Sequence, residues 1–185
     1  AVRAYGISLA LQNLGYNSEL IAYSDDMDGL RKIPSGFPPW LKDHIAKPVS
    51  QIPDPFGDCH NSYGSHMSSL LLDGLNSVSV KYVFKSATDV YKSGILIDVI
   101  DQILTQSEYL GRKISEFVGQ NKFLNELPYF PICKNCGKLY VAHAYKYLPK
   151  NKKVLYECSD TKIGNNEIKG CSYKGEADIG KAEGK

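Results

Sequence analysis

The chain has 185 residues, of which 43% are hydrophobic and 23% are charged. This length suits one domain of about 100–200 residues, or one domain with a small addition. The longest mainly apolar run, residues 95–100, is far shorter than the ~20 residues of a membrane-spanning helix. No secretion signal opens the chain, and a Cys-x-x-Cys among five cysteines favours metal ligands over disulfides. We therefore expect a cytoplasmic, metal-binding protein with no membrane contact.

Charge is distributed unevenly along the chain. Residues 133–174 contain nine lysines and three acidic residues, a local balance of +6. Since the whole chain carries a formal net charge of +2, the remaining residues carry −4. This asymmetry predicts two functional regions, and the basic region is a candidate nucleic-acid surface.

Apolar spacing predicts a helix over residues 1–15 and a strand over 18–24. A helix leading into such a strand usually follows a parallel partner strand, although a surface helix that begins the domain fits equally well. Six prolines then exclude continuous helix or central strand over residues 25–61. A long irregular segment of this kind inside a compact domain is usually functional.

Regular patterns return after residue 61. Helical spacing predicts helices over 62–77, 87–92 and 95–119, and alternation predicts a strand over 78–85. This alternation of helices and strands predicts a parallel α/β layer. From Tyr129 onward the pattern changes to short tyrosine-rich strands, basic loops and cysteines.

Four cysteines lie in this last region. Cys133 and Cys136 form a Cys-x-x-Cys knuckle followed by glycine, and Cys158 and Cys171 are separated by a polar loop. Four thiolates suit the tetrahedral coordination of zinc, so the pattern predicts a zinc ribbon rather than four unrelated buried cysteines. His143 is a spare ligand candidate.

A second group of possible ligands lies in the proline-rich segment. Asp54, Cys59, His60 and His66 fall within thirteen residues and could form a tetrahedral site with mixed S, N and O ligands. A nucleophilic Cys–His pair is less favoured, because adjacent residues rarely direct their side chains at one another. A loop with incidental polar residues is the remaining alternative.

A third group follows the first predicted strand. Asp25, Asp26 and Asp28 lie where ligands bind in open α/β sheets, beyond the carboxyl end of a strand. These carboxylates could hold a substrate ammonium or a metal. Arg31 and Lys32 could instead neutralise them and leave a solvated turn, and composition does not separate the two alternatives.

Several runs together resemble the class I lysyl-tRNA synthetases of the archaeal type, in the right order over nearly the whole chain. The most specific are Asp-Asp-Met-Asp-Gly-Leu-Arg-Lys-Ile-Pro at 25–34 and Ile-Pro-Asp-Pro-Phe-Gly at 52–57. The others are Ala-Lys-Pro at 46–48, Cys59-His60 with His66, and Tyr156-Glu157-Cys158 leading towards Gly184-Lys185.

The resemblance implies a partial Rossmann-type nucleotide-binding catalytic domain with a zinc-ribbon connective insertion. Residues 1–128 would form the first half of the catalytic domain without its first strand, 129–179 the insertion, and 180–185 the return to the second half. It further implies a ligase that activates lysine with ATP and Mg²⁺ and transfers it to the 3′ end of tRNA(Lys).

The resemblance also implies site residues. Two structural zinc ions would be held by Asp54, Cys59, His60 and His66, and by Cys133, Cys136, Cys158 and Cys171. Asp58 looks like an extra residue, so either Asp54 or Asp58 is the carboxylate ligand. Asp26 and Asp28 are expected at the edge of the substrate pocket. The clustered lysines expected to contact the tRNA acceptor end are Lys146, Lys150, Lys152 and Lys153.

Two family signatures are absent from the sequence, the HIGH-like and the KMSKS-like motifs that stabilise charge during adenylate formation. We therefore expect an internal fragment of the enzyme, inactive by itself and with no catalytic residue of its own. The alternative is a non-catalytic zinc-ribbon RNA-binding protein, whose interleaved tyrosines and lysines would stack on bases and contact phosphates.

Overall fold

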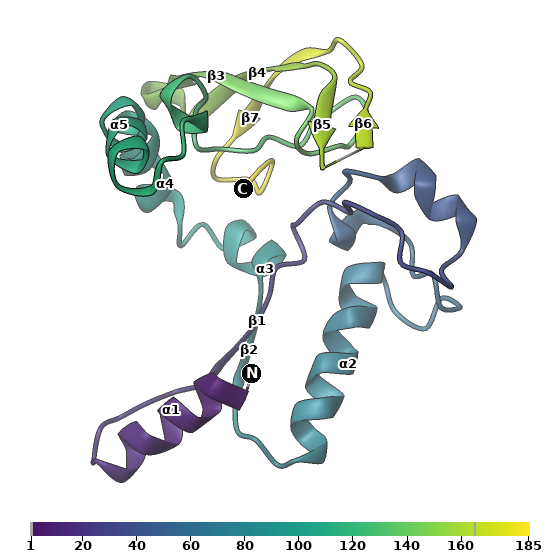
Figure 1. Cartoon of the computed structure of the whole chain (residues 1–185), viewed down its shortest axis with the longest axis vertical. Coiled ribbons are helices and arrows are strands. Elements are labelled where there is room, and N and C mark those ends of the chain that lie inside the picture. The colour runs from purple at the N-terminus through teal and green to yellow at the C-terminus, as the bar shows by residue number, and fades with distance from the viewer. Residues whose placement is uncertain (1, 165) are drawn as a thin grey trace.

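Two short parallel strands, β1 (Ile21–Ser24) and β2 (Val83–Ser86), form one sheet of the computed structural model, which describes residues 2–164 and 166–185 (Figure 1). Helix α1 (Val2–Asn13) precedes β1, and helix α2 (Tyr63–Ser77) belongs to the connection from β1 to β2. The mixed α/β class predicted from the sequence is confirmed.

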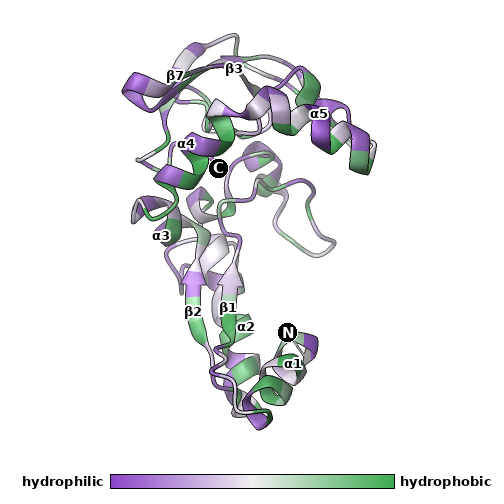
Figure 2. Cartoon of the chain, turned by 90° about the vertical axis from the view of Figure 1, so that its left-hand side faces the viewer, coloured by the Kyte–Doolittle hydropathy of each residue, from purple (hydrophilic) through white to green (hydrophobic). Residues whose placement is uncertain are grey.

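The parallel pair exposes apolar side chains within the described part of the chain. Ile21 and Tyr23 are 49% and 47% exposed, and Val83 and Phe84 are both 38% exposed. Figure 2 shows hydrophobic residues along β1, β2, α1 and α2. Because parallel strands are normally covered on both faces, this end of the molecule presents an apolar surface rather than a closed core.

A three-stranded antiparallel sheet and a hairpin occupy the other end of the molecule (Figure 1). The sheet has the order β3–β4–β7, with β3 at Ala142–Leu148, β4 at Lys153–Cys158 and β7 at Lys174–Asp178. The hairpin pairs β5 (Thr161–Ile163) with β6 (Asn166–Ile168). We call residues 129–179 the antiparallel unit.

The main core lies in this unit because one face of each strand is apolar. In β4, alternate residues Val154, Tyr156 and Cys158 are fully buried. Helix α4 (Ile97–Thr105) covers this core with Leu104, which is 3% exposed. The antiparallel unit thus contains most of the buried apolar side chains that bring its cysteines together.

The chain enters and leaves the antiparallel unit through one neck of paired backbone. The Phe130 N–H donates to the Lys185 carbonyl at 2.7 Å, and the Lys185 N–H donates to the Phe130 carbonyl at 3.1 Å. The Ile132 N–H donates to the Glu183 carbonyl at 2.9 Å. The two ends of the unit therefore lie side by side.

The proline-rich segment contains only short 3₁₀ turns, at Pro39–His44 and Val49–Gln51, as its composition predicts. Leu30, Leu41 and Ile52 of this segment, residues 25–61, form a separate small core with Tyr63 of α2. The Leu30 N–H donates to the Lys47 carbonyl at 2.9 Å, which ties the loop after β1 to this segment. The long irregular segment is therefore an ordered structure.

Several predicted boundaries are wrong. The first helix ends at Asn13 rather than residue 15, and the predicted strand over 18–24 is only Ile21–Ser24. The strand predicted over 78–85 begins at Val83, because Val78 caps α2 and Ser79 has φ = 54°.

The helix predicted over 95–119 is two helices, α4 and α5 (Ser107–Val118), separated at Gln106. Leu104 of α4 packs into the main core, whereas Gly111 of α5 lies against the backbone of Phe123. The Gln106 N–H donates to the Gln102 and Leu104 carbonyls, which closes α4 before α5 begins at Ser107. The short helix predicted over 87–92 is α3 (Ala87–Lys92). No helix in the described residues is long and apolar enough to cross a membrane.

Two glycines of α2 provide a matched test of its packing. A Cβ at Gly64 would lie 3.1 Å from the Ser50 nitrogen and 3.2 Å from Asp26 Cβ, whereas a Cβ at Gly74 meets no atom within 4 Å. We expect Gly74→Ala to raise the free energy of unfolding by about 0.5–1 kcal/mol through helix propensity. Gly64→Ala should lower it by about 1 kcal/mol, because crowding exceeds that gain. Urea denaturation of both variants checks the signs, and equal stabilisation would contradict the close packing.

Candidate functional site

The four cysteines of the antiparallel unit converge on one point. Their sulfur atoms all lie within 4.8 Å of one another, with Cys133 and Cys171 3.6 Å apart and Cys136 and Cys158 3.8 Å apart. Metal–sulfur bonds of about 2.3 Å in a tetrahedron require sulfur separations of about 3.8 Å. The cluster therefore fits a tetrahedral metal.

Local backbone explains why distant cysteines meet. Gly137 adopts φ = 70° and its N–H donates to the Cys133 carbonyl at 2.8 Å, which closes the knuckle. The β5–β6 hairpin takes up most of the loop between Cys158 and Cys171. Gly170 allows the two ends of that loop to approach closely, since it has no side chain and a Cβ there would lie only 2.6 Å from Ser159 Cα. The Cys171 N–H also donates to the Cys158 sulfur at 3.3 Å.

The electrostatic surroundings of these thiols differ. A hydrogen bond from Asn135 lowers the pKa of Cys171 to about 6, despite partial desolvation. Burial raises the pKa of Cys158. One ligand is thus readily ionised, and the buried one needs a cation to stabilise its thiolate.

A second cluster of possible metal ligands lies where the proline-rich segment meets α2. Asp54, Cys59 and His60 of the segment and His66 of α2 present ligand atoms within 4.8 Å of one another. His66 Nδ1 is 3.1 Å from Asp54 Oδ2 and 3.3 Å from the Cys59 sulfur. His60 Nδ1 is 3.1 Å from that sulfur and 3.2 Å from His66 Nδ1. Four lone-pair donors directed at one centre suit a cation.

Asp54 is held as the ionised member of this group. Burial opposes its ionisation, but hydrogen bonds from the Phe56 N–H, His66, Cys59 and the His60 N–H outweigh burial and hold its pKa well below the ordinary value. Asp58, the other carboxylate considered from the sequence, has φ = 58°, is exposed and lies outside the group.

Helix α2 positions His66 in its first turn. Ser62 caps the helix by accepting from the Ser65 N–H at 3.1 Å, and the Ser65 hydroxyl accepts from the Ser62 N–H at 2.9 Å. This reciprocal capping fixes the entry of the chain into the helix. His66 is thereby directed back towards Asp54.

The loop after β1 contains a charged network around Asp28. Lys185 Nζ lies 2.9 Å from Asp28 Oδ1 and 3.1 Å from both carboxylate oxygens of Asp25. The Tyr140 hydroxyl donates to Asp28 Oδ1 at 2.5 Å, and Arg31 lies 3.1 Å from Asp28 Oδ2. Burial opposes ionisation of Asp28, but the hydrogen bonds from Tyr140 and Lys185 lower its pKa.

Asp26 has a different role in this loop. Its Oδ1 accepts from the Thr88 N–H at 2.8 Å, in the first turn of α3, so it does not share the Asp28 network. Sequence reasoning grouped these carboxylates and missed Tyr140 and Lys185, which are 112 and 157 residues from Asp28. No local pattern predicts contacts across such distances.

The four predicted tRNA-binding lysines lie on β3, β4 and the turn that joins them. Lys146 and Lys150 are exposed. Lys152 forms an ion pair with Asp101 of α4, and Lys153 forms one with Glu176 of β7. Two of the four charges are therefore partly neutralised within the fold.

The fold and the two ligand clusters define a mixed α/β protein with two candidate metal sites, and comparison with known proteins places the chain in a family. The family described as tRNA synthetases class I (K) matches residues 1–185. A lysine–tRNA ligase of Cenarchaeum symbiosum (strain A) is 54% identical over 185 residues, which are 100% of this chain and 35% of that protein. A lysine–tRNA ligase of Rickettsia prowazekii (strain Madrid E) is 35% identical over 146 residues, 77% of this chain and 27% of that protein.

The chain thus spans about a third of the length of the Cenarchaeum relative. The protein belongs to the class I lysyl-tRNA synthetase family.

The choice between the two carboxylates gives a test of the second cluster. We expect Asp54→Ala to lower the amount of metal that the chain binds, because Asp54 supplies the only oxygen ligand of its group. Asp58→Ala should leave the metal content of the chain unchanged. Elemental analysis of both variants, purified with zinc, measures the difference. Metal loss in Asp58→Ala alone would contradict the geometry.

The Asp28 network predicts a pH-dependent stability. Because the pKa of Asp28 is lowered on folding, its contribution is present above its ordinary pKa of about 4 and is lost as pH falls through the lowered value. We expect Asp28→Asn to lower the free energy of unfolding by about 1 kcal/mol near pH 7. The deficit should shrink as the pH falls below the ordinary carboxylate pKa and through the lowered pKa of Asp28.

Asp43→Asn removes the same charge from an exposed carboxylate and serves as the control, with a smaller expected deficit near pH 7. Denaturation at several pH values measures both variants. A deficit for Asp28→Asn that stays constant with pH would mean that Lys185, Arg31, Tyr140 and Asp25 do not depend on this charge.

Proposed function

We propose that this chain is part of a lysine–tRNA ligase that activates lysine with ATP and Mg²⁺ and transfers it to tRNA(Lys). The family match over residues 1–185 carries the proposal. It spans the α/β part and the antiparallel unit alike. That extent favours the ligase over a stand-alone zinc-ribbon RNA-binding protein.

In this proposal residues 1–128 are the first half of a Rossmann-type catalytic domain. The parallel pairing of β1 with β2 and the helical crossover through α2 support it. Asp26 and Asp28 lie beyond the carboxyl end of β1, where ligands bind in such sheets. The ammonium of Lys185 lies between Asp25 and Asp28, which supports the suitability of Asp28 for binding an amino group at the pocket edge.

Residues 129–179 are, in this proposal, a zinc-ribbon insertion, and residues 180–185 return to the second half of the catalytic domain. The side-by-side ends at Phe130 and Lys185 support an insertion. Cys133, Cys136, Cys158 and Cys171 would hold one zinc ion, and Asp54, Cys59, His60 and His66 a second. Four protein ligands leave no open position for a reacting water, so both ions are structural.

The antiparallel unit is also the proposed contact for the tRNA acceptor end. Lysines neutralise phosphates and release bound counterions, which makes binding depend on salt. Lys146 on β3 and Lys150 in the turn after it are exposed, and within residues 2–164 and 166–185 neither forms an ion pair. We therefore assign the larger share of phosphate contact to Lys146 and Lys150 and the smaller share to Lys152 and Lys153.

Charge removal tests the proposed tRNA surface. Changing Lys146, Lys150, Lys152 and Lys153 to Ala should weaken the binding of a tRNA(Lys) transcript and reduce its salt dependence. The log–log slope should fall by about one for each lysine that contacts a phosphate. The Lys146/Lys150 pair should account for more of this loss than the Lys152/Lys153 pair. Filter binding at several salt concentrations measures both quantities.

Lys81 and Lys85, exposed on and before β2, give a control that loses two positive charges, as the Lys146/Lys150 pair and the Lys152/Lys153 pair each do. Changing both to Ala should leave affinity and slope near those of the wild type. If the four-lysine variant behaves like this control, the cluster is only a solvated face. If the zinc-loaded wild type binds no tRNA, the proposed function itself is contradicted.

A further inference from the structure

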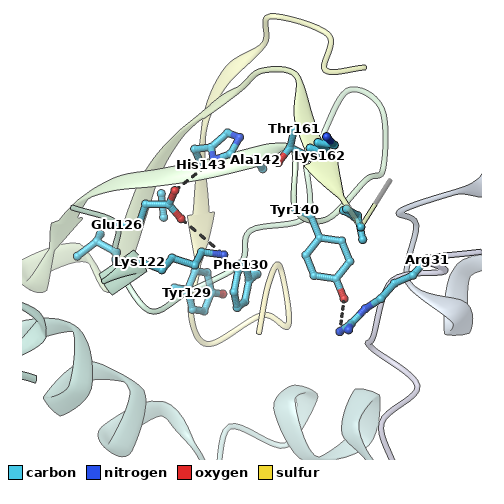
Figure 3. Close-up of a pocket in the computed structure, with 14 residues that line it drawn as sticks. Arg31, Lys122, Glu126, Tyr129, Phe130, Tyr140, Ala142, His143, Thr161 and Lys162 are labelled. Atoms are coloured by element: carbon cyan, nitrogen blue, oxygen red, sulfur yellow. Dashed lines mark hydrogen bonds and ion pairs between the residues drawn. The ribbon is translucent and has the colours of Figure 1, made fainter. Parts of the chain in front are cut away.

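A cavity of about 500 Å³ opens between the antiparallel unit and the loop after β1 (Figure 3). Residues from four separate segments line it, among them Arg31, Lys122, Phe130, Tyr140 and Thr161. The cavity contains no ligand of either metal cluster. It is therefore a separate feature of the molecule.

Aromatic rings form one wall of this cavity. Phe130 and Tyr140 meet edge to face, with ring centroids 5.8 Å apart and an interplanar angle of 72°. The Tyr140 hydroxyl is fixed by Asp28 and by the Gly29 N–H, which donates to it at 3.2 Å. A Cβ at Gly29 would lie 2.6 Å from the Tyr140 ring, so the glycine permits this close seating. The position of the Tyr140 ring in this wall is thus set by contacts within the chain.

Cations lie over these rings. Lys122 Nζ is 4.5 Å from the centroid of Phe130, and Arg31 Cζ is 5.5 Å from that of Tyr140. Lys122 is exposed, and its ammonium lies 3.7 Å from Glu126 Oε2, which is long for an ion pair. Its ammonium is thus held loosely at the mouth of the cavity.

The opposite side of the cavity is lined by small side chains and by polar ones. Ala142 and Ala144 are small, and Thr161 of β5 contributes a hydroxyl. His143 Nδ1 lies 4.0 Å from Glu126 Oε1, and its Nε2 has no hydrogen-bond partner within residues 2–164 and 166–185. The cavity thus combines an aromatic face, cations at its rim and hydrogen-bonding groups.

We propose that this cavity binds one unpaired nucleotide of RNA, with its base stacked on Phe130 and its phosphate beside Lys122 and Arg31. Single-stranded RNA is recognised by stacking on aromatic rings combined with cationic contacts to the backbone. An exposed cation–π contact is weaker than base–aromatic stacking, so a base displaces the Lys122 ammonium from the ring. The freed ammonium then pairs with the phosphate. The inference rests on the proposed function, which supplies tRNA as the RNA.

The experiment uses zinc-loaded protein and tRNA(Lys) transcripts with 2-aminopurine at each unpaired 3′ position in turn. Stacking quenches this base, so we expect quenching at one position when the protein binds. Phe130→Leu should abolish the quenching and weaken binding about tenfold, within the range for one base–aromatic stack. Phe130→Tyr should retain both. Tyr145→Leu, which removes a 58% exposed ring elsewhere on β3, should change neither.

A second transcript without the unpaired 3′ strand separates the possible failures. Its affinity should be the same for the wild type and Phe130→Leu. Equal weakening of both transcripts, or quenching that persists in Phe130→Leu, overturns the inference and leaves the proposed function intact. If the wild type binds neither transcript, the proposed function fails as well.

Two further arms keep the test decisive. If Phe130→Leu loses zinc or its circular-dichroism spectrum, Thr161→Leu replaces it, because a bulky aliphatic side chain at the rim should obstruct the cavity without adding a ring that stacks, and should reduce the quenching. Quenching of free 2-aminopurine ribonucleoside monophosphate as strong as that of the transcript would assign the cavity to free nucleotides and overturn the RNA proposal.

Discussion

One carboxylate holds together parts of the chain that are far apart in sequence. Asp28, in the loop after β1, accepts a hydrogen bond from Tyr140 of the antiparallel unit. It also forms an ion pair with Lys185, which follows that unit in the chain. A partly buried carboxylate is costly unless it is paired, and here three partners satisfy it. This contact is one of several that join the α/β part to the antiparallel unit, and the aromatic wall of the cavity also depends on it, since Tyr140 belongs to both.

The two candidate metal sites lie in parts of the chain that have small apolar cores. The antiparallel unit has few residues with which to build an apolar interior, and the proline-rich segment has only a small core around Leu41 and Ile52. Segments of this size commonly rely on metals for stability. Each ligand cluster lies beside one of these cores. Cys133 and Cys158 are themselves fully buried members of the larger one.

Sequence reasoning succeeded where spacing along the chain determines geometry. The Cys-x-x-Cys knuckle and the prolines of residues 25–61 are local signals, and the structure places their residues as expected. It failed where tertiary contacts decide. The ion pairs of Lys152 and Lys153 follow from carboxylates on other elements, and the apolar spacing of residues 95–119 gave no sign of the break at Gln106. Tyr140 carried no signal beyond its residue type, because its partner lies 112 residues away.

The paired backbone at Phe130 and Lys185 has a mechanical consequence. The antiparallel unit joins the chain at this neck, and other contacts link the two parts as well, among them the hydrogen bond from the Leu139 N–H to the Ala46 carbonyl and the ion pair of Lys152 with Asp101. Lys185 belongs to the neck through its backbone and to the β1 loop through its ammonium. The backbone pairing at the base of the antiparallel unit is therefore coupled, through one residue, to the positions of the Asp25 and Asp28 carboxylates.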